Sequence, residues 1–252
     1  MSMNEQELCR KRLIDLSRQA NRRGVVLFSD FLGLNELNIY HQTSHLFETR
    51  TESFGGAAHA ERQIVAFLPD ALYYEWEYPI AALHILPAHP KFAESFGHRD
   101  VLGAVMNLGI DRGKVGDILI GDGEAYILCH ESVAGYFAEH LDRIRNTAVK
   151  LLPCPLEELT VHREFEEHEG IISSNRLDAL IACVYRLSRS QSLVLFRQEK
   201  VFVDGKLMTD PAHSCSAGNV VSVRGFGRFV YQSDYGETGK GRLKIRYQIY
   251  KN

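Results

Sequence analysis

Cationic side chains gather in the last third of this sequence of 252 residues. The stretch from Arg176 to Asn252 holds 13 Lys and Arg against 6 Asp and Glu, a net charge of +7 in a chain whose formal net charge is −3. Lysine and arginine neutralise phosphate groups and release counterions, which gives protein–nucleic acid complexes most of their affinity. The charge asymmetry therefore predicts a nucleic-acid partner for this part of the chain. A charged face that only meets solvent is the alternative.

Ten residues of this stretch are candidates for binding a phosphate backbone. Most are cations, and two serines stand at the expected start of a helix, where hydroxyl and backbone N–H groups bind phosphate. For Arg176 the alternative is a structural ion pair with Asp178 or with the glutamates upstream. The candidates are Arg176, Arg186, Ser188, Arg189, Ser190, Arg197, Lys200, Lys206, Arg224 and Arg228.

A first short helix is expected to position Arg176 and the turn that carries Arg186. It should begin near Asn175, which with Asp178 three residues later matches a capping box. Apolar residues recur at helical spacing after that cap, so one face should be buried. This face consists of Leu177, Leu180, Ile181 and Val184.

A second helix is expected from Arg189 to about Glu199, and it would carry Ser190 and Arg197. Ser188 and Gln191 form another capping box at its start. Leu193 and Phe196 should face the first helix. The two helices would then present their cations around one turn.

A small β-structure is expected behind the helices. Val201–Val203 is β-branched and aromatic, and it leads into Asp204-Gly205, the dipeptide that favours a type I′ hairpin turn. A further strand is expected at Val220–Arg224, followed by a bend at Gly225-Phe226-Gly227. Lys206, Arg224 and Arg228 would lie on this structure.

Four spaced blocks of this region resemble the S4 RNA-binding domain, which is named after a ribosomal small-subunit protein. They are Arg176-Leu177-Asp178, Leu187-Ser188-Arg189-Ser190, Val201-Phe202-Val203-Asp204-Gly205-Lys206 and Val220-Val221-Ser222-Val223-Arg224-Gly225. Asn219 departs from the family, which usually has Asp after the glycine at this turn. The resemblance implies that RNA is the partner. Structured RNA has a narrow major groove, so recognition of shape and backbone is expected.

The chain upstream predicts an α+β fold of several domains. Residues 1–75 are expected to be mainly helical, and residues 153–173 to be an acidic linker with one strand near Leu159–His162. Residues 76–152 show the order β-α-β-β-α-β, which is that of ferredoxin-like and RRM domains. Tyr126 is the only aromatic residue of their central hairpin, so base stacking on this sheet is not expected. Residues 174–252 complete the chain as the S4-like domain.

Further motifs resemble the YlmH family, bacterial proteins encoded near cell-division genes. They are Asp30-Phe31-Leu32, Phe54-Gly55-Gly56, Glu61-Arg62, His98-Arg99-Asp100-Val101-Leu102-Gly103, Leu108-Gly109-Ile110-Asp111-Arg112, Gly116-Asp117-Ile118 and Arg224-Gly225-Phe226-Gly227-Arg228. The resemblance spans nearly the whole chain and implies an α-rich N-terminal domain, an RRM-like central domain and an S4 domain. It also implies a ribosome-associated factor that binds large-subunit rRNA, tRNA or both during rescue of stalled large subunits carrying peptidyl-tRNA. A related branch occurs in photosynthetic organisms, and both branches stay open.

An RNA-modifying enzyme, like a pseudouridine synthase, is the alternative function. The sequence lacks the catalytic motifs of S4-containing synthases, and His98-Arg99-Asp100 lacks the other segments of a kinase. Histidine spacing predicts no metal site, and Cys129 and His130 would point to opposite faces of a strand. We therefore expect no catalytic residue, metal or cofactor.

Composition predicts a soluble, cytoplasmic protein. Hydrophobic residues make up 45% of the chain and charged residues 24%, and no apolar run is long enough for a membrane helix. The five cysteines are scattered and never form a CxxC pair, which is typical of free thiols in a reducing compartment. We expect a monomer with no membrane partner.

Overall fold

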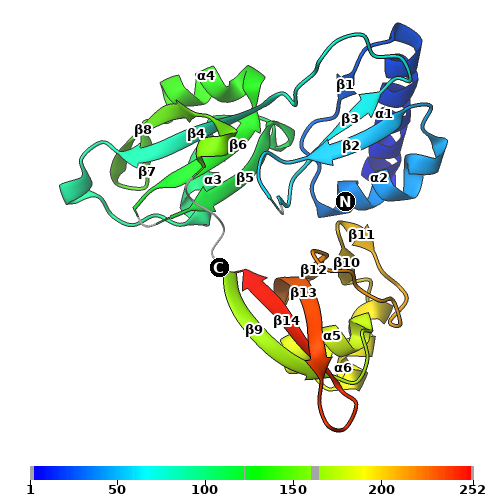
Figure 1. The fold of residues 1–252 in the computed structure, drawn as a ribbon. Helices are drawn as coiled ribbons and strands as arrows, with labels where there is room; N and C mark the ends of the chain where they lie inside the picture. Colours follow the sequence, from blue (N-terminus) through cyan, green and yellow to red (C-terminus); the bar gives the residue numbers. More distant parts are fainter. Residues whose placement is uncertain (1–2, 59, 122, 160–164, 251–252) are drawn as a thin grey trace. The chain divides into compact units, whose positions relative to one another are not determined.

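The computed structural model describes residues 3–58, 60–121, 123–159 and 165–250 (Figure 1). The chain divides into two compact units, residues 1–162 and 163–252. Both units combine helices with antiparallel sheets, which agrees with the predicted α+β class. Each unit is described by itself.

The first unit begins with two helices that pack on a three-stranded sheet. Leu13 and Leu37 of the helices share a core with Val65 and Phe67 of the central strand. The sheet order is β1-β3-β2. Residues expected to be mainly helical therefore also contain three strands. The elements are α1 (Met3–Arg23), β1 (Leu27–Phe28), α2 (Leu34–Thr43), η1 (Ser44–Leu46), β2 (Arg50–Phe54) and β3 (Ile64–Leu68).

The rest of the first unit is a five-stranded sheet with two helices. The sheet order is β5-β6-β4-β8-β7, and α3 and α4 share a core with one face of it through Val101, Phe137, Ile85 and Ile127. The short strand β7 is an addition to the predicted order. The elements are β4 (Ile80–Pro87), η2 (Pro90–Phe92), α3 (His98–Asn107), η3 (Arg112–Lys114), β5 (Val115–Ile120), β6 (Ala125–His130), α4 (Glu131–His140), β7 (Arg143–Ile144), β8 (Thr147–Cys154) and η4 (Leu156–Glu158).

The opposite face of this sheet is also covered by protein. Ala82, Tyr126 and Leu128 on that face are buried in a second cluster with Leu159, which follows η4. Ala57, from the segment after β2, packs against the same cluster. The sheet therefore lies between two apolar layers and does not present an open face at these residues.

Arg62 joins the two halves of the first unit. Its Nη2 donates to the backbone oxygens of Phe31 at 2.6 Å and Arg112 at 3.1 Å, and its Nε donates to the oxygen of Val115 at 2.8 Å. The backbone N–H of Arg62 donates in turn to Asp117 Oδ1 at 3.2 Å. Burial lowers the pKa of Arg62, because removal from water disfavours the charged guanidinium. Arg62 of the Glu61-Arg62 motif therefore has a structural role, because it links three separate backbone segments.

The second unit is a six-stranded sheet with two helices on one face. The sheet order is β11-β10-β12-β13-β14-β9. Leu180 of α5 and Phe196 of α6 share a core with Val221, Phe229 and Tyr247 of the sheet. The elements are β9 (Phe165–Ile172), α5 (Leu177–Val184), α6 (Arg189–Arg197), β10 (Val201–Val203), β11 (Lys206–Leu207), β12 (Val220–Val223), β13 (Gly227–Glu237) and β14 (Leu243–Tyr250).

The prediction that residues 153–173 form a linker is wrong for their second half. Residues 165–172 are strand β9, which pairs with β14 along its whole length. The glutamates of β9 bond to β14, where Arg246 Nε lies 3.3 Å from Glu169 Oε1 and Gln248 Nε2 donates to Glu167 Oε1 at 3.1 Å. The acidic composition thus reflects cross-strand pairing with a basic strand. Of the predicted strand at 159–162, residues 160–162 lie outside the described residues.

The predicted capping box at Asn175 is also wrong. Helix α5 starts at Leu177 with Arg176 at its N-cap, and the Asn175 side chain donates instead to the oxygen of Cys215 at 2.9 Å. Asp178 cannot complete that box because arginines occupy its carboxylate. In α6, Phe196 is buried in the core as predicted, but Leu195 fills the second core position and Leu193 does not.

Candidate nucleic-acid interface

A buried carboxylate connects two of the candidate arginines. Asp178 has no exposed side-chain surface, and it accepts from Arg176 Nε at 3.0 Å and from Arg189 Nε at 3.1 Å. Burial favours protonation of Asp178, but the bonds from Arg176 and Arg189 outweigh it and hold the pKa of this carboxyl below its usual value. The side chain of Arg176 stays 36% exposed and that of Arg189 63%. The ion pair considered for Arg176 therefore exists, and both arginine side chains keep exposed surface.

Arg186 occupies a strained position in the turn between the helices. Its φ is 53°, and it follows the C-cap of α5. Its N–H donates to the oxygen of Cys183 at 3.4 Å, and the N–H of Leu187 donates to the oxygen of Ala182 at 2.9 Å, which is a Schellman motif. Glycine usually fills this position, because a left-handed conformation costs other residues about 1–2 kcal/mol. The Arg186 side chain is exposed, so the strained position presents a cation to solvent.

A second Schellman motif positions Lys200. Glu199 has a φ of 52°, its N–H donates to the oxygen of Phe196 at 3.0 Å, and the N–H of Lys200 donates to the oxygen of Leu195 at 3.0 Å. The oxygen of Lys200 then accepts from the N–H of Arg224 at 2.9 Å. The structure therefore brings Lys200 and Arg224 together at one end of the sheet.

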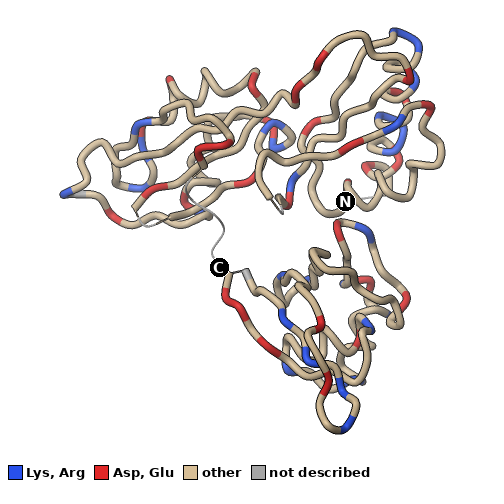
Figure 2. Tube along the Cα trace, in the orientation of Figure 1, with Lys and Arg blue, Asp and Glu red and all other residues tan. Residues whose placement is uncertain are grey.

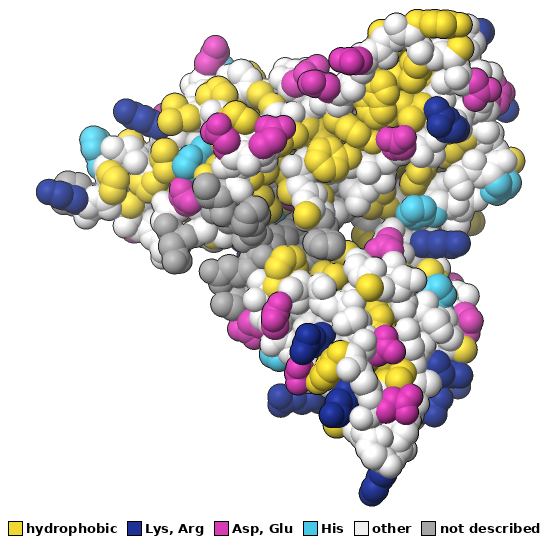
Figure 3. Space-filling model, viewed as in Figure 1, with side chains coloured by type: hydrophobic (Ala, Val, Ile, Leu, Met, Phe, Trp, Pro, Cys, Tyr) yellow, Lys and Arg dark blue, Asp and Glu magenta, His cyan; other side chains and the backbone are white. Residues whose placement is uncertain are grey.

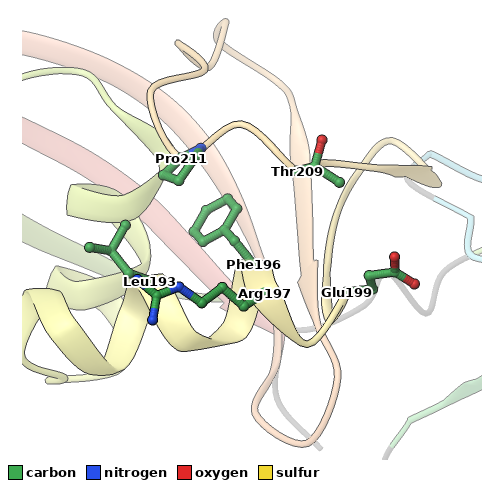
Figure 4. A pocket seen from close by; sticks show the side chains of 6 residues that line it. All are labelled: Leu193, Phe196, Arg197, Glu199, Thr209 and Pro211. Carbon is green, nitrogen blue, oxygen red and sulfur yellow. The ribbon is translucent and has the colours of Figure 1, made fainter.

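Arg197 lines a shallow hollow of about 370 Å³ at the end of α6 (Figure 4). The ring of Phe196 and the side chains of Leu193 and Pro211 supply an apolar lining, and Glu199 and Thr209 complete it. The guanidinium of Arg197 is exposed. Leu193, predicted to face α5, lines this hollow instead.

The sheet carries the remaining cations. Asp204 and Gly205 have φ values of 49° and 81°, so the predicted hairpin turn is confirmed, and it places exposed Lys206 at the start of β11. The guanidinium of Arg224 lies 4.7 Å from the ring centroid of Phe202, a cation–π contact that orients it. Arg228, half-buried, stands opposite Ser222 across the β12–β13 pair.

The two candidate serines differ in what they already do. Ser188 Oγ accepts from the N–H of Gln191 at 3.2 Å, and the Gln191 side chain accepts from the N–H of Ser188 at 2.8 Å, which confirms the predicted capping box. Ser190 is exposed in the first turn of α6, with its Oγ 3.0 Å from Ser188 Oγ. Ser190 is the freer of the two for an external phosphate, since Ser188 stabilises the helix.

The cations of the second unit are interspersed with acidic residues. Figure 2 shows Lys and Arg along its helices and at the turn after β13, and Asp and Glu along β9. Figure 3 shows dark blue and magenta side chains alternating on the visible face of this unit. Phe226, missing from the candidates, is 44% exposed between Arg224 and Arg228. The sequence signal for an exposed Phe226 was its position between two glycines at a predicted bend.

The groups that resemble catalytic motifs have structural uses. Asp100, from His98-Arg99-Asp100, accepts from the N–H of Gly97 at 2.9 Å and so caps α3. Burial raises the pKa of Cys129 to about 12, so this thiol is a poor nucleophile. Among the described residues, no group of three or more His, Cys, Asp or Glu side chains could hold a metal ion. No helix of the described ranges is long and apolar enough to cross a membrane.

Known proteins match this chain in sequence and fold. Residues 75–158 match a family model described as "Putative RNA-binding domain in YlmH". "Ribosome-associated protein quality control protein P2" of Bacillus subtilis (strain 168) is 29% identical over 225 residues, which cover 88% of this chain and 87% of that protein. The solved structure "Cell division protein ylmH from Streptococcus pneumoniae" aligns with a TM-score of 0.50 and 23% identity, over 63% of this chain and 96% of that chain. This last likeness concerns the fold alone.

Proposed function

We propose that this chain, which is similar to proteins of the YlmH family, is a non-enzymatic RNA-binding protein of the large ribosomal subunit. Its targets are structured rRNA, tRNA or both, and its role is the rescue of stalled peptidyl-tRNA complexes. Residues 76–152 act as an RRM-like domain and residues 174–252 as an S4 domain. The protein works as a cytoplasmic monomer without a cofactor. The ribosome-associated relative and the RNA-binding family model support this function.

The observation that carries the proposal is the set of exposed cations on α5, α6 and the turn between them, two of which Asp178 holds. A guanidinium that is already fixed by a carboxylate loses little conformational entropy when it binds a phosphate. Binding is therefore more favourable than for a freely moving side chain. One carboxylate neutralises only one of the two charges. Arg176 and Arg189 together keep a net positive charge, and both side chains remain partly exposed.

The start of α6 adds a second kind of phosphate donor. Arg189 and Ser190 occupy its first two positions, where backbone N–H groups have no partner within the helix. The exposed Arg186 side chain projects from the turn just before it. Phosphates of a folded RNA strand would therefore meet side-chain and backbone donors around one turn, without any need to read bases.

Removing Arg186 and Arg197 together tests this function. Both side chains are exposed, and neither touches Asp178, so Arg186→Ala with Arg197→Ala leaves the carboxylate and its two arginines intact. We expect the double variant to leave the large-subunit fractions of a sucrose gradient. The matched control is Lys240→Ala with Arg242→Ala, an equal loss of charge at the exposed turn between β13 and β14. Unchanged sedimentation of the first variant would contradict the proposal.

A further inference from the structure

The central sheet of the first unit has its usual RNA-binding face blocked. Four-stranded sheets of the RRM type stack RNA bases on exposed aromatic side chains. Here Tyr126 is only 2% exposed, and its ring stacks on His84 with centroids 4.2 Å apart. His84 Nε2 lies 2.6 Å from Glu124 Oε2, and Leu159 packs on the same face. Any RNA that this domain binds must therefore meet another surface.

The helical side of the same domain has an open hollow of about 550 Å³. It lies along α3 and beside the chain that links α4 to β7. Arg99, Arg143 and Arg145 line it, and all three are exposed. Leu108 and Leu141 give it an apolar floor. A volume of this size holds a nucleotide unit, and pockets that bury ligands typically range from about 300 to 1,000 Å³.

The local structure directs the arginines toward this hollow. Ile144 is fully buried in the core, so Arg143, its neighbour in β7, points to the opposite side, and both Arg143 and Arg145 line the hollow. Arg145 has a φ of 53° in the tight turn between β7 and β8. An arginine in this left-handed conformation is strained where asparagine or glycine would not be. As at Arg186, the strained residue is an exposed cation.

Acidic groups around the hollow offset only part of its positive charge. Asp100 accepts from the N–H of Gly97 at 2.9 Å and lies 3.8 Å from Arg145 Nε. Asp142 is the other carboxylate among the lining residues. His140 also lines the hollow, with its ring stacked on Tyr136 at 4.1 Å. Three guanidinium groups thus face two carboxylates, one of which already caps a helix.

We propose that this hollow is the RNA-contacting site of the central domain and holds one nucleotide unit of an RNA strand. Arg99, Arg143 and Arg145 bind the phosphates on either side of the nucleotide, and the floor at Leu108 and Leu141 contacts its sugar and base. This proposal rests on the proposed function and adds a site on the helical side of the domain. The strand crosses the helices and leaves the covered sheet face untouched.

Photocrosslinking of the full chain locates the contact directly. The probe is an RNA hairpin with 4-thiouridine in its unpaired loop, and crosslinked peptides are identified by mass spectrometry. We expect crosslinks within residues 99–108 and 140–145. Crosslinks on β4 and β6, or only within residues 174–231, would overturn this site and leave RNA binding by the protein intact. The absence of crosslinks anywhere would overturn the proposed function as well.

Charge removal provides the second test. We expect Arg99→Ala with Arg143→Ala to weaken binding of the hairpin roughly tenfold and to lower the slope of log K against log salt by about 2. Lys91→Ala with Lys150→Ala is the matched control, because both lysines are exposed on the same domain outside the hollow. Equal losses for the two variants would contradict the site. Adenosine monophosphate should not displace the hairpin, and displacement would point to a free nucleotide as ligand.

Discussion

Ser192 in α6 donates from its Oγ to the backbone oxygen of Asp178 in α5 at 2.9 Å, and both residues are buried. Asp178 therefore fixes the second helix twice, through its oxygen to Ser192 and through its carboxylate to Arg189. The residue whose carboxylate orients the candidate arginines therefore also joins the two helices. Of these two bonds, only the one to Arg189 depends on the Asp178 side chain.

Replacing Asp178 by Asn should weaken the second unit and change its response to acid. The amide keeps the shape but loses the charge-assisted bonds, which should cost about 1–3 kcal/mol at neutral pH. The folded pKa of Asp178 is lowered, so its stabilisation is present above its unfolded pKa of about 3.9 and is lost as the pH falls through the folded value. Urea titrations of both proteins should differ at pH 7 and converge in acid. A constant difference at all pH values would contradict this role.

Arg186 and Glu199 form a matched pair for separating stability from RNA binding. Both occupy the left-handed position of a Schellman motif, with φ values of 53° and 52°. Substitution by Gly should relieve the strain in each case, so both variants should unfold at the same or a higher temperature than the wild type. RNA affinity should fall for Arg186→Gly and stay level or rise for Glu199→Gly, which removes an acidic group. A parallel change in affinity for both would assign the effect to the turns rather than the charge.

Replacement of Arg62 should lower the free energy of unfolding of the first unit by a large amount. Arg62→Met would leave the backbone oxygens of Phe31, Arg112 and Val115 without this donor, at a cost of roughly 3 kcal/mol. Trp76 is the only tryptophan and its ring packs against Phe28, so its fluorescence reports the unfolding of this unit. Arg22→Met, at an exposed position of α1, is the control and should leave the transition unchanged.

Most helices, strands and turns could be predicted from the sequence, because the signals for them lie in neighbouring residues. The capping box at Ser188 and the turn at Asp204-Gly205 depend on neighbouring residues, and both were predicted correctly. The YlmH resemblance was confirmed for the same reason, because its motifs are short and contiguous. Asn175 and β9 were mispredicted because their partners are distant in sequence: Cys215 for the first, and β14 for the second. Composition alone cannot show that a glutamate faces an arginine 77 residues away.

The pairing of β9 with β14 predicts which N-terminal boundary a folded fragment of the second unit needs. A fragment starting at Arg163 keeps the eight-residue strand that covers the edge of β14, whereas one starting at Ser174 loses it. The shorter fragment exposes the backbone groups of Leu243–Tyr250 and removes buried Ile172 from the core, so it should aggregate or unfold without a cooperative transition. The longer fragment should melt in one step by circular dichroism. If both melt alike, the acidic strand contributes little, and the boundary inferred from the sequence is sufficient for folding.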